Sequence, residues 1–266
     1  MVKSRYKYDD GGCFMLIFYV RHGDPIYDPD TLTPLGERQA ESVAKRLALF
    51  GVDEIYASTS TRAIQTAQPL CELTGKKLIT LDFLNENDIE PKLKLPVDES
   101  GKISWMWSHP YYSEVMARRE VREMGDEWHK HPEFESFHFG EVIEPIYEKI
   151  DELIASYGYE HDSDKGLYKV TERNHEKRIA IFAHECMGKI FMSHLLDIPF
   201  AYYAAHMEMK HTGVTVVRLD DGGSRNKGDV PREYARARML TMSNDSHLYR
   251  DGLPLNHAST SMRDRY

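Results

Sequence analysis

Two periods of hydrophobic residues alternate along the first third of the chain. An unbroken apolar run at 14–20 is typical of a strand that is buried on both faces of a parallel sheet. Residues 33–51 begin with a helix N-cap and a proline, carry apolar side chains at helical spacing and end at a glycine, which predicts an amphipathic helix. A strand at 53–57, a helix at 58–75 and a strand at 77–81 continue the series. The alternation predicts an α/β fold with a mostly parallel sheet and helices on both faces.

The alternation stops between residues 85 and 139. This segment mixes four prolines with all three tryptophans and shows no sustained period. We therefore expect 85–139 to be an inserted lid or specificity segment within a single α/β domain that comprises residues 1–266. Helical spacing returns at 142–154 and predicts another helix, followed by a polar connection through Asn174.

The last third of the chain returns to the pattern of a sheet. An apolar strand at 178–183 is followed by a helix that should stop near Pro199. Two further strands, at 214–219 and 234–242, flank a turn-rich stretch and predict a hairpin on the sheet edge. We expect residues 243–266 to form a polar tail.

The composition and charge of the chain limit the kinds of molecule that it is expected to bind. The chain has 266 residues, with 34 Lys and Arg against 43 Asp and Glu, so its formal net charge is −9. An acidic chain argues against a general nucleic-acid or anionic-membrane surface, although a local basic pocket can still bind a small anion. The longest apolar run is much shorter than the roughly 18 residues that a membrane span needs. We therefore expect the partner to be a small molecule, not nucleic acid or a membrane. The oligomeric state stays open, and a homo-oligomer is one possibility.

The cysteines and histidines predict no metal centre. The three cysteines are odd in number, lie far apart and form no C-x-x-C pair, so neither a disulfide framework nor a zinc site is indicated. A reducing, cytoplasmic location is therefore expected. Histidines cluster at 109–138, but their spacing matches no known metal site, and we predict no metal ligands.

Candidate chemistry begins where the first strand ends. Arg21, His22 and Gly23 stand at that end, and ligands of open α/β sheets bind beyond the carboxyl ends of the strands. The guanidinium can clamp an anion, the imidazole can act as base or nucleophile, and the glycine lets the backbone approach a ligand. A polar loop with a solvated histidine is the alternative interpretation.

Arg62 and His184 stand at two further strand-to-helix junctions. A cation is unfavourable in the first turn of a helix, so Arg62 makes sense if an anion binds at that helix start. Pairing with a carboxylate such as Asp53 or Glu54 is the alternative. If the strands are parallel, the two histidines and two arginines converge on one edge of the sheet.

Four stretches follow one another along the chain, namely Phe-Tyr-Val-Arg-His-Gly-Asp at 18–24, Leu-Thr-Pro-Leu-Gly-Glu-Arg-Gln-Ala at 32–40, Tyr-Ala-Ser-Thr-Ser-Thr-Arg-Ala-Ile-Gln-Thr-Ala at 56–67 and Ile-Phe-Ala-His at 181–184. In sequence, order and spacing they resemble the histidine phosphatase superfamily, which includes cofactor-dependent phosphoglycerate mutases and many phosphomonoesterases. The resemblance covers the core and leaves the insertion and the tail unexplained. It implies a phosphoglycerate mutase-like, three-layer α/β/α fold and an enzyme without metal or cofactor.

The resemblance also implies a phosphohistidine mechanism. His22 is then the nucleophile that attacks phosphorus, and Arg21, Arg62 and His184 bind the phosphoryl oxygens. Cationic donors of this kind neutralise charge that develops on the equatorial oxygens. Gly23 belongs to the same substrate-binding group.

The general acid of the family is a glutamate on the segment after the third strand. Glu86 is the best local match, with Asp88 and Glu90 as rivals, and a residue that only caps or solvates the lid is the alternative interpretation of Glu86. Glu185 follows the second histidine where many members carry small glycines, and it places a carboxylate at the edge of the pocket. His211 is expected at the pocket rim, so Glu185 and His211 complete the predicted substrate-binding group.

We predict a metal-independent phosphomonoester hydrolase that acts on a small phosphorylated metabolite. Phosphoryl transfer of the phosphoglycerate mutase type shares every core residue and is the first alternative. A mutase must exclude water until the phosphoryl group returns, and this lid lacks the arginine- and proline-rich pattern associated with mutases. A catalytically inactive module that binds a phosphorylated ligand is the second alternative, although such a module is expected to have lost its nucleophile or its clamp.

Overall fold

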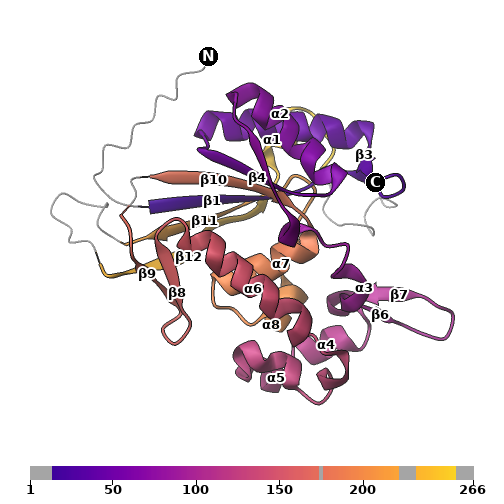
Figure 1. The fold of residues 1–266 in the computed structure, drawn as a ribbon. Helices are drawn as coiled ribbons and strands as arrows, with labels where there is room; N and C mark the ends of the chain where they lie inside the picture. Colours follow the sequence, from indigo (N-terminus) through magenta and orange to yellow (C-terminus); the bar gives the residue numbers. More distant parts are fainter. Residues whose placement is uncertain (1–13, 174–175, 222–231, 256–266) are drawn as a thin grey trace.

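A central sheet crosses the computed structural model, which describes residues 14–173, 176–221 and 232–255 (Figure 1). The strands of this sheet are β1 (Phe14–Arg21), β4 (Glu54–Ser58), β5 (Leu78–Leu81), β8 (Tyr159–Asp162), β9 (Leu167–Val170), β10 (Lys177–Ala183), β11 (Val214–Asp220) and β12 (Tyr234–Asn244). They are ordered β5-β4-β10-β1-β11-β12-β9-β8 across the sheet. A small separate hairpin, β2 (Pro25–Ile26) and β3 (Thr31–Leu32), follows β1.

One half of the sheet is parallel. β5, β4, β10 and β1 run in the same direction, and the register of β1 with β10 sets Arg21 opposite Ala183. β1 pairs antiparallel with β11, and the strands beyond β11 continue antiparallel. Because parallel strands end on the same side, His22 and His184 follow two neighbouring strand ends.

Helices cover both faces of the sheet, as the sequence predicts. They are α1 (Pro34–Phe50), α2 (Thr61–Thr74), α6 (Gly140–Ala155), α7 (Glu185–Leu195), α8 (Phe200–His206) and, near the C-terminus, α9 (Ser246–Arg250). α1 and α2 lie over one face, whereas α6, α7 and α8 lie over the other (Figure 1). None of the helices in the described part of the chain is long and apolar enough to cross a membrane.

Alternate residues of β1 face the two helical layers. Met15, Ile17 and Tyr19 belong to the core beneath α6, α7 and α8. Phe18 and Val20 belong to the core beneath α1 and α2. All five side chains are buried, so the continuous apolar run of the sequence reflects a strand that is covered on both faces.

The predicted ends of α1 and α2 are confirmed by their caps. Thr33 precedes α1, and its side chain accepts a hydrogen bond from the Gly36 amide at 3.0 Å. Ser60 precedes α2 and accepts from the Ala63 amide at 3.4 Å. Gly75 ends α2 in the left-handed region with φ of 69°. Local side-chain chemistry therefore sets these boundaries.

Residues 85–139 form a series of short elements beside the α6, α7 and α8 layer. These are α3 (Glu90–Leu93), β6 (Lys94–Pro96), β7 (Ile103–Trp105), η2 (Met106–Ser108), α4 (Tyr112–Met116), α5 (Arg119–Glu123), η3 (Gly125–Lys130) and η4 (Glu135–Phe137), where η denotes a 3₁₀ turn. Trp128 is 1% exposed, and its ring centroid lies 5.5 Å from that of Phe200 in α8. The apolar side chains of the segment therefore join the core of the neighbouring layer.

The polar connection predicted through Asn174 is wrong for residues 159–170, where β8 and β9 form a hairpin at the sheet edge. Asn174 itself lies outside the described residues. An edge strand in contact with water tolerates polar residues, and the short Tyr-Glu-His-Asp of β8 has no apolar run that reveals it. Because this hairpin takes the edge, the predicted antiparallel pair of β11 and β12 lies inside the sheet. The turn-rich stretch between them falls largely outside the described residues.

Two further segments differ from the prediction near the C-terminus. α8 begins directly after Pro199, where the sequence analysis expects no element. The polar tail is wrong for residues 243–250, which complete β12 and form α9. The Ser42 hydroxyl on α1 donates to the His247 carbonyl oxygen at 2.9 Å and holds α9 against α1. These contacts join residues about 200 positions apart, beyond the reach of any local pattern.

Candidate active site

Three buried imidazoles meet beyond the carboxyl ends of β1 and β10. The ring centroid of His22 lies 5.3 Å from that of His184 and 5.4 Å from that of His211. All three residues are at most 6% exposed. The structure thus brings His22 and His184 together at one edge of the sheet, and His211 joins them from the loop before β11.

The ring of His22 is fixed by its neighbour in sequence. Nδ1 lies 2.7 Å from the Gly23 carbonyl oxygen, and because a carbonyl only accepts, Nδ1 carries the proton and donates. Nε2 then holds the lone pair, and no described residue forms a hydrogen bond with it. Burial, and after it the charge of Arg21, lowers the pKa of His22 well below its usual range. His22 is therefore a neutral imidazole, the form that a nucleophile or base requires.

The loop after His22 packs closely against the start of α1. A Cβ atom on Gly23 would lie 2.7 Å from the Gly36 carbonyl oxygen, and one on Gly36 would lie 2.2 Å from the Asp24 carbonyl oxygen. The Gly23 amide also donates to Thr66 Oγ1 of α2 at 3.0 Å. The sequence predicts that Gly23 lets the backbone approach a ligand, and the structure adds that it lets the loop approach α1.

Arg62 lies in the first turn of α2 and is 4% exposed. Its NH1 atom is 2.9 Å from Asp30 Oδ1, and its NH2 atom is 3.4 Å from Glu86 Oε1. Asp30 Oδ2 also accepts from the Thr61 amide at 2.8 Å, so a carboxylate occupies the helix start that favours an anion. The partners of Arg62 are thus carboxylates other than those at 53–54, and Asp30 is a site residue that the sequence analysis misses.

His184 bridges Arg62 and the end of β4. Its Nδ1 atom lies 3.0 Å from NH2 of Arg62 and accepts, because a guanidinium only donates. Nε2 then carries the proton and donates to Ser58 Oγ at 2.8 Å. Burial, followed by the charges of Arg62 and Arg21, lowers the pKa of His184 well below its usual range. Ser58 is a second missed site residue, because a single serine at a strand end forms no pattern.

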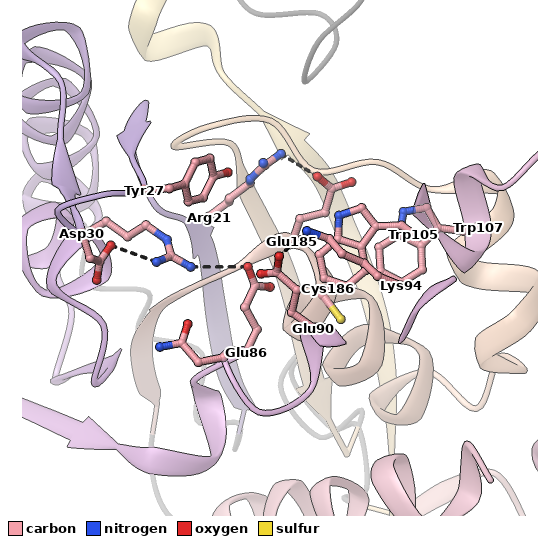
Figure 2. A pocket seen from close by; sticks show the side chains of 12 residues that line it. Arg21, Tyr27, Asp30, Glu86, Glu90, Lys94, Trp105, Trp107, Glu185 and Cys186 are labelled. Carbon is pink, nitrogen blue, oxygen red and sulfur yellow. Dashed lines mark hydrogen bonds and ion pairs between the residues drawn. The ribbon is translucent and has the colours of Figure 1, made fainter. Parts of the chain in front are cut away.

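Arg21 enters the site from the last position of β1 (Figure 2). Its NH1 atom donates to Glu185 Oε2 and to the Met209 carbonyl oxygen, both at 2.6 Å. Glu185 Oε1 is in turn 3.5 Å from Nζ of Lys189, one turn further along α7. The Nε atoms of Arg21 and Arg62 are buried and have no hydrogen-bond partner among the described residues. Both arginines also line the cavity described below.

Glu86 lies inside the site and is 6% exposed. Its Oε1 atom is 3.7 Å from His184 Nδ1, and its Oε2 atom is buried with no hydrogen-bond partner among the described residues. Burial raises the pKa of Glu86 to about 7, against the opposing charges of Arg62 and Arg21. A carboxyl group with this pKa can give up or take a proton near neutral pH. The rival Asp88 is exposed.

Arg21, Arg62 and Glu86 line a cavity of about 470 Å³, which other residues of the 85–139 segment also line (Figure 2). Trp105 and Trp107 stack with ring centroids 4.7 Å apart, and Nζ of Lys94 lies 4.9 Å from the Trp105 ring. Lys94 also forms an ion pair with Glu90, the third candidate for the general acid. Cys186 lines the same cavity, and burial raises the pKa of its thiol well above the usual range, which favours a protonated structural cysteine.

Residues from the C-terminal part of the chain pack against the loop that follows β1. His211 Nδ1 lies 3.6 Å from Asp24 Oδ1, and the amide of the next residue, Thr212, donates to the Arg21 carbonyl oxygen at 2.9 Å. Nε2 of His247 is 3.1 Å from the Thr212 hydroxyl. Burial lowers the pKa of His247 to about 4, so its ring is neutral near pH 7. The polar sequence around His247 thus has a structural role that its local pattern does not show.

Sequence comparison places the chain beside known phosphoryl-transfer proteins. The histidine phosphatase superfamily (branch 1) matches residues 17–228. A probable phosphoglycerate mutase of Yersinia enterocolitica is 34% identical over 79 residues, which are 26% of this chain. The matched part spans 37% of that curated relative.

Two solved structures share the fold over most of their length. A mycobacterial glucosyl-3-phosphoglycerate phosphatase, 20% identical, aligns with a TM-score of 0.50 over 87% of this chain and 99% of its own. A phosphoserine phosphatase of Entamoeba histolytica, 16% identical, aligns with a TM-score of 0.50 over 88% of this chain and 99% of its own. The likeness confirms the phosphoglycerate mutase-like α/β fold that the sequence predicts.

Proposed function

The chain belongs to the histidine phosphatase superfamily, and from this premise we propose that it hydrolyses phosphomonoesters of small metabolites through a phosphohistidine intermediate. In this proposal no metal ion takes part in the reaction. The two similar structures are named as phosphatases of a glucosyl phosphoglycerate and of phosphoserine, which supports a small phosphorylated substrate.

The first step is nucleophilic attack by His22. Nε2 bonds to phosphorus while the bond between phosphorus and the ester oxygen breaks. The observation that carries this step is the 2.7 Å hydrogen bond from Nδ1 to the Gly23 carbonyl oxygen, because it leaves the lone pair on Nε2. The lowered pKa of His22 supports the same role, since no proton has to be removed before attack.

Arg21, Arg62 and His184 stabilise the transferring phosphoryl group. When the phosphoryl group is bound, His184 does so as the tautomer that carries its proton on Nδ1, with Nε2 accepting from the Ser58 hydroxyl. The partnerless Nε donors of the two arginines are buried, and a buried donor without a partner is costly unless a ligand completes it. Phosphoryl oxygens supply that partner and spread their charge over both guanidinium groups. Glu185 acts as a positioning residue, because it holds Arg21 through NH1 at 2.6 Å.

Glu86 moves the proton in both half-reactions. In the first it protonates the ester oxygen, so the substrate leaves as a neutral alcohol. In the second it takes a proton from water as the water oxygen attacks phosphorus, the bond from phosphorus to Nε2 of His22 breaks and inorganic phosphate leaves. A pKa of about 7 suits both directions near neutral pH.

The segment 85–139 is proposed to select the substrate within a single domain. It supplies Glu86, Lys94, Trp105 and Trp107 to the wall of the cavity. A volume of about 470 Å³ limits the organic part of the substrate to metabolite size. Lys94 and Glu90 offer this part of the substrate one cation and one carboxylate.

The proposal is tested with an aryl phosphate in excess chelator. We expect phosphate release by the wild type, none by His22→Ala, and wild-type rates for His138→Asn, a matched histidine variant on the exposed lid surface. Rapid quenching should trap acid-labile, base-stable phosphate on the wild type alone. Full activity in His22→Ala, or complete loss of wild-type activity in chelator, overturns the proposal.

Product analysis separates the hydrolase from its alternatives. A hydrolase gives inorganic phosphate and free alcohol in equal amounts from phosphorylated three-carbon acids, whereas a mutase returns a positional isomer without net phosphate release. An inactive binding module binds the phosphorylated ligand and produces neither. Phosphorus NMR of the reaction mixture distinguishes the three results.

A further inference from the structure

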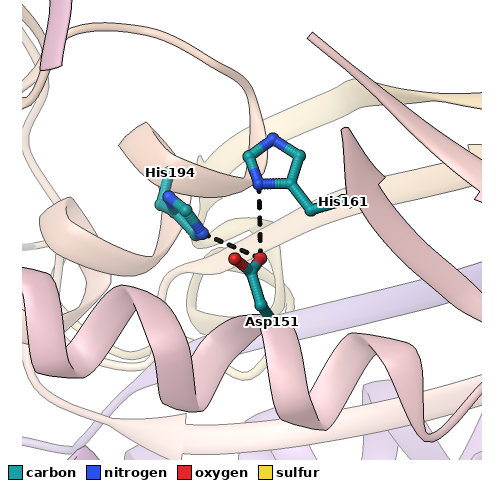
Figure 3. A group of neighbouring side chains, drawn as sticks. All are labelled: Asp151, His161 and His194. Atoms are coloured by element: carbon teal, nitrogen blue, oxygen red, sulfur yellow. Dashed lines mark hydrogen bonds and ion pairs between the residues drawn. The ribbon is translucent and has the colours of Figure 1, made fainter. Parts of the chain in front are cut away.

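Two histidines and an aspartate meet at a second place in the fold, outside the cavity described above (Figure 3). Asp151 comes from α6, His161 from β8 and His194 from α7. Along α7, His194 is nine residues beyond Glu185, or about 13.5 Å at the helical rise of 1.5 Å per residue. The cluster therefore takes no part in the chemistry proposed for His22.

The ligand atoms of the cluster lie close enough together to bind one metal ion. Asp151 Oδ1 lies 2.8 Å from His194 Nε2 and 3.4 Å from His161 Nδ1. Metal–ligand bonds of roughly 2.0–2.1 Å at tetrahedral angles place neighbouring ligand atoms roughly 3.3–3.4 Å apart. All three ligand atoms lie within 4.8 Å of one another, so small side-chain movements bring them onto one ion.

A second carboxylate orients one of the histidines. Nε2 of His161 lies 3.1 Å from Asp197 Oδ1 and 3.2 Å from Oδ2. A histidine that binds a metal through one ring nitrogen commonly donates its other N–H to a carboxylate, which fixes the ring and raises its basicity. Asp197 performs this function from a left-handed backbone conformation with φ of 51°, which is uncommon for a residue other than glycine. His161 thus directs Nδ1 towards Asp151.

Aromatic packing holds both imidazoles in place. The ring of Tyr147 stacks on His194 with centroids 4.2 Å apart and an interplanar angle of 11°. The ring of Tyr168 stacks on His161 with centroids 4.9 Å apart and an angle of 21°. A ligand set whose rings are locked by packing loses little conformational freedom when it binds an ion.

We propose that Asp151, His161 and His194 bind Zn²⁺ or a chemically similar transition-metal ion. Two imidazoles and one carboxylate suit zinc, whereas Mg²⁺ prefers oxygen ligands alone. The Asp151 side chain is 37% exposed, so water can complete the fourth position. The bound ion links α6, α7 and the edge hairpin of β8 and β9, so its role is structural. The proposed hydrolysis does not require it.

The sequence analysis predicts no metal ligands, and the reason for the difference is topological. The histidines that lie close together in sequence are those at 109–138. Asp151, His161 and His194 span 44 positions and belong to three separate elements, so no short spacing reveals them.

Metal binding is tested on untagged, chelator-stripped protein by calorimetric titration with ZnCl₂. We expect one equivalent of Zn²⁺ per wild-type chain, a higher melting temperature with zinc, and no such response to MgCl₂. Co²⁺ should give the visible absorption bands of a tetrahedral nitrogen and oxygen site, which Zn²⁺ then displaces. Aryl phosphate hydrolysis is recorded separately in chelator, so a failure of the hydrolase proposal leaves the metal result readable.

Ligand variants identify the site. Asp151→Asn and His194→Gln should weaken zinc binding by more than about tenfold, and Asp197→Asn by about 10–100-fold, through loss of His161 orientation. His138→Asn, which removes an exposed histidine paired with a single glutamate, should bind as the wild type does. Far-UV circular dichroism in chelator shows whether each variant is folded. Absence of saturable zinc binding in the wild type, or equal binding by folded Asp151→Asn and His194→Gln, refutes the proposal and leaves the cluster as a network of ion pairs.

Discussion

Replacing Glu86 with glutamine should make the protein more stable and less active. The pKa of this buried carboxyl is raised from its ordinary value of 4.5 to about 7, chiefly by burial. The stabilisation linked to its bound proton is therefore full below pH 4.5 and is lost as the pH rises to 7. At 1.36 kcal/mol for each pKa unit, the folded state loses about 3 kcal/mol between these pH values.

Glutamine keeps the shape of the protonated side chain and cannot ionise. Glu86→Gln should consequently exceed the wild type in free energy of unfolding by about 3 kcal/mol at pH 8, and the difference should shrink towards zero near pH 4.5. The activity should change in the opposite direction. For an alkyl phosphate, whose leaving oxygen needs a proton, kcat/KM should fall by roughly 10²–10⁴ at pH 6.

Urea unfolding at pH 5, 6, 7 and 8 measures the first effect, and initial rates with alkyl and nitrophenyl phosphates measure the second. The nitrophenolate needs less protonation, so its rate should fall less. Asp88→Asn is the matched control, because Asp88 is exposed on the same segment and should alter neither stability nor activity. A stability difference that is independent of pH, or an alkyl phosphate rate unchanged in Glu86→Gln, refutes the role assigned to Glu86.

Four further substitutions test the support of the site. Arg62→Lys removes the planar fork beside His184 and should lower kcat/KM by roughly 10²–10³ in steady-state assays, with unchanged circular dichroism. Thr66→Val leaves the buried amide of the adjacent loop without its 3.0 Å acceptor and should cost about 1–3 kcal/mol in urea unfolding, whereas Thr66→Ser should not. Gly36→Ala places a Cβ atom 2.2 Å from a carbonyl oxygen of the same loop and should lower both activity and melting temperature, and normal activity would contradict the close approach. Trp128→Ala should cost about 3–5 kcal/mol, measured by the same unfolding assay, because it leaves a cavity in the core that residues 85–139 share with the helices.

The sequence alone determined the features whose causes are local. The caps Thr33 and Ser60 and the terminal Gly75 set the ends of α1 and α2 through contacts within a few residues. The apolar runs of β1 and β10 predicted strands that are covered on both faces of the sheet. The motif around His22 also indicated the family, because its residues are contiguous in the sequence.

The tertiary structure decided what depends on residues far apart in the chain. Ser58 reaches His184 only because β4 and β10 pair in parallel, and Asp30 reaches Arg62 from the turn between β2 and β3. The raised pKa of Glu86 has no trace in the sequence, since burial creates it. The edge hairpin of β8 and β9 and the cluster around Asp151 arise in the same way, from pairing and packing between separate elements. Local propensity acts over a few residues, whereas pKa values, ion pairs and ligand sets depend on the neighbours that folding supplies.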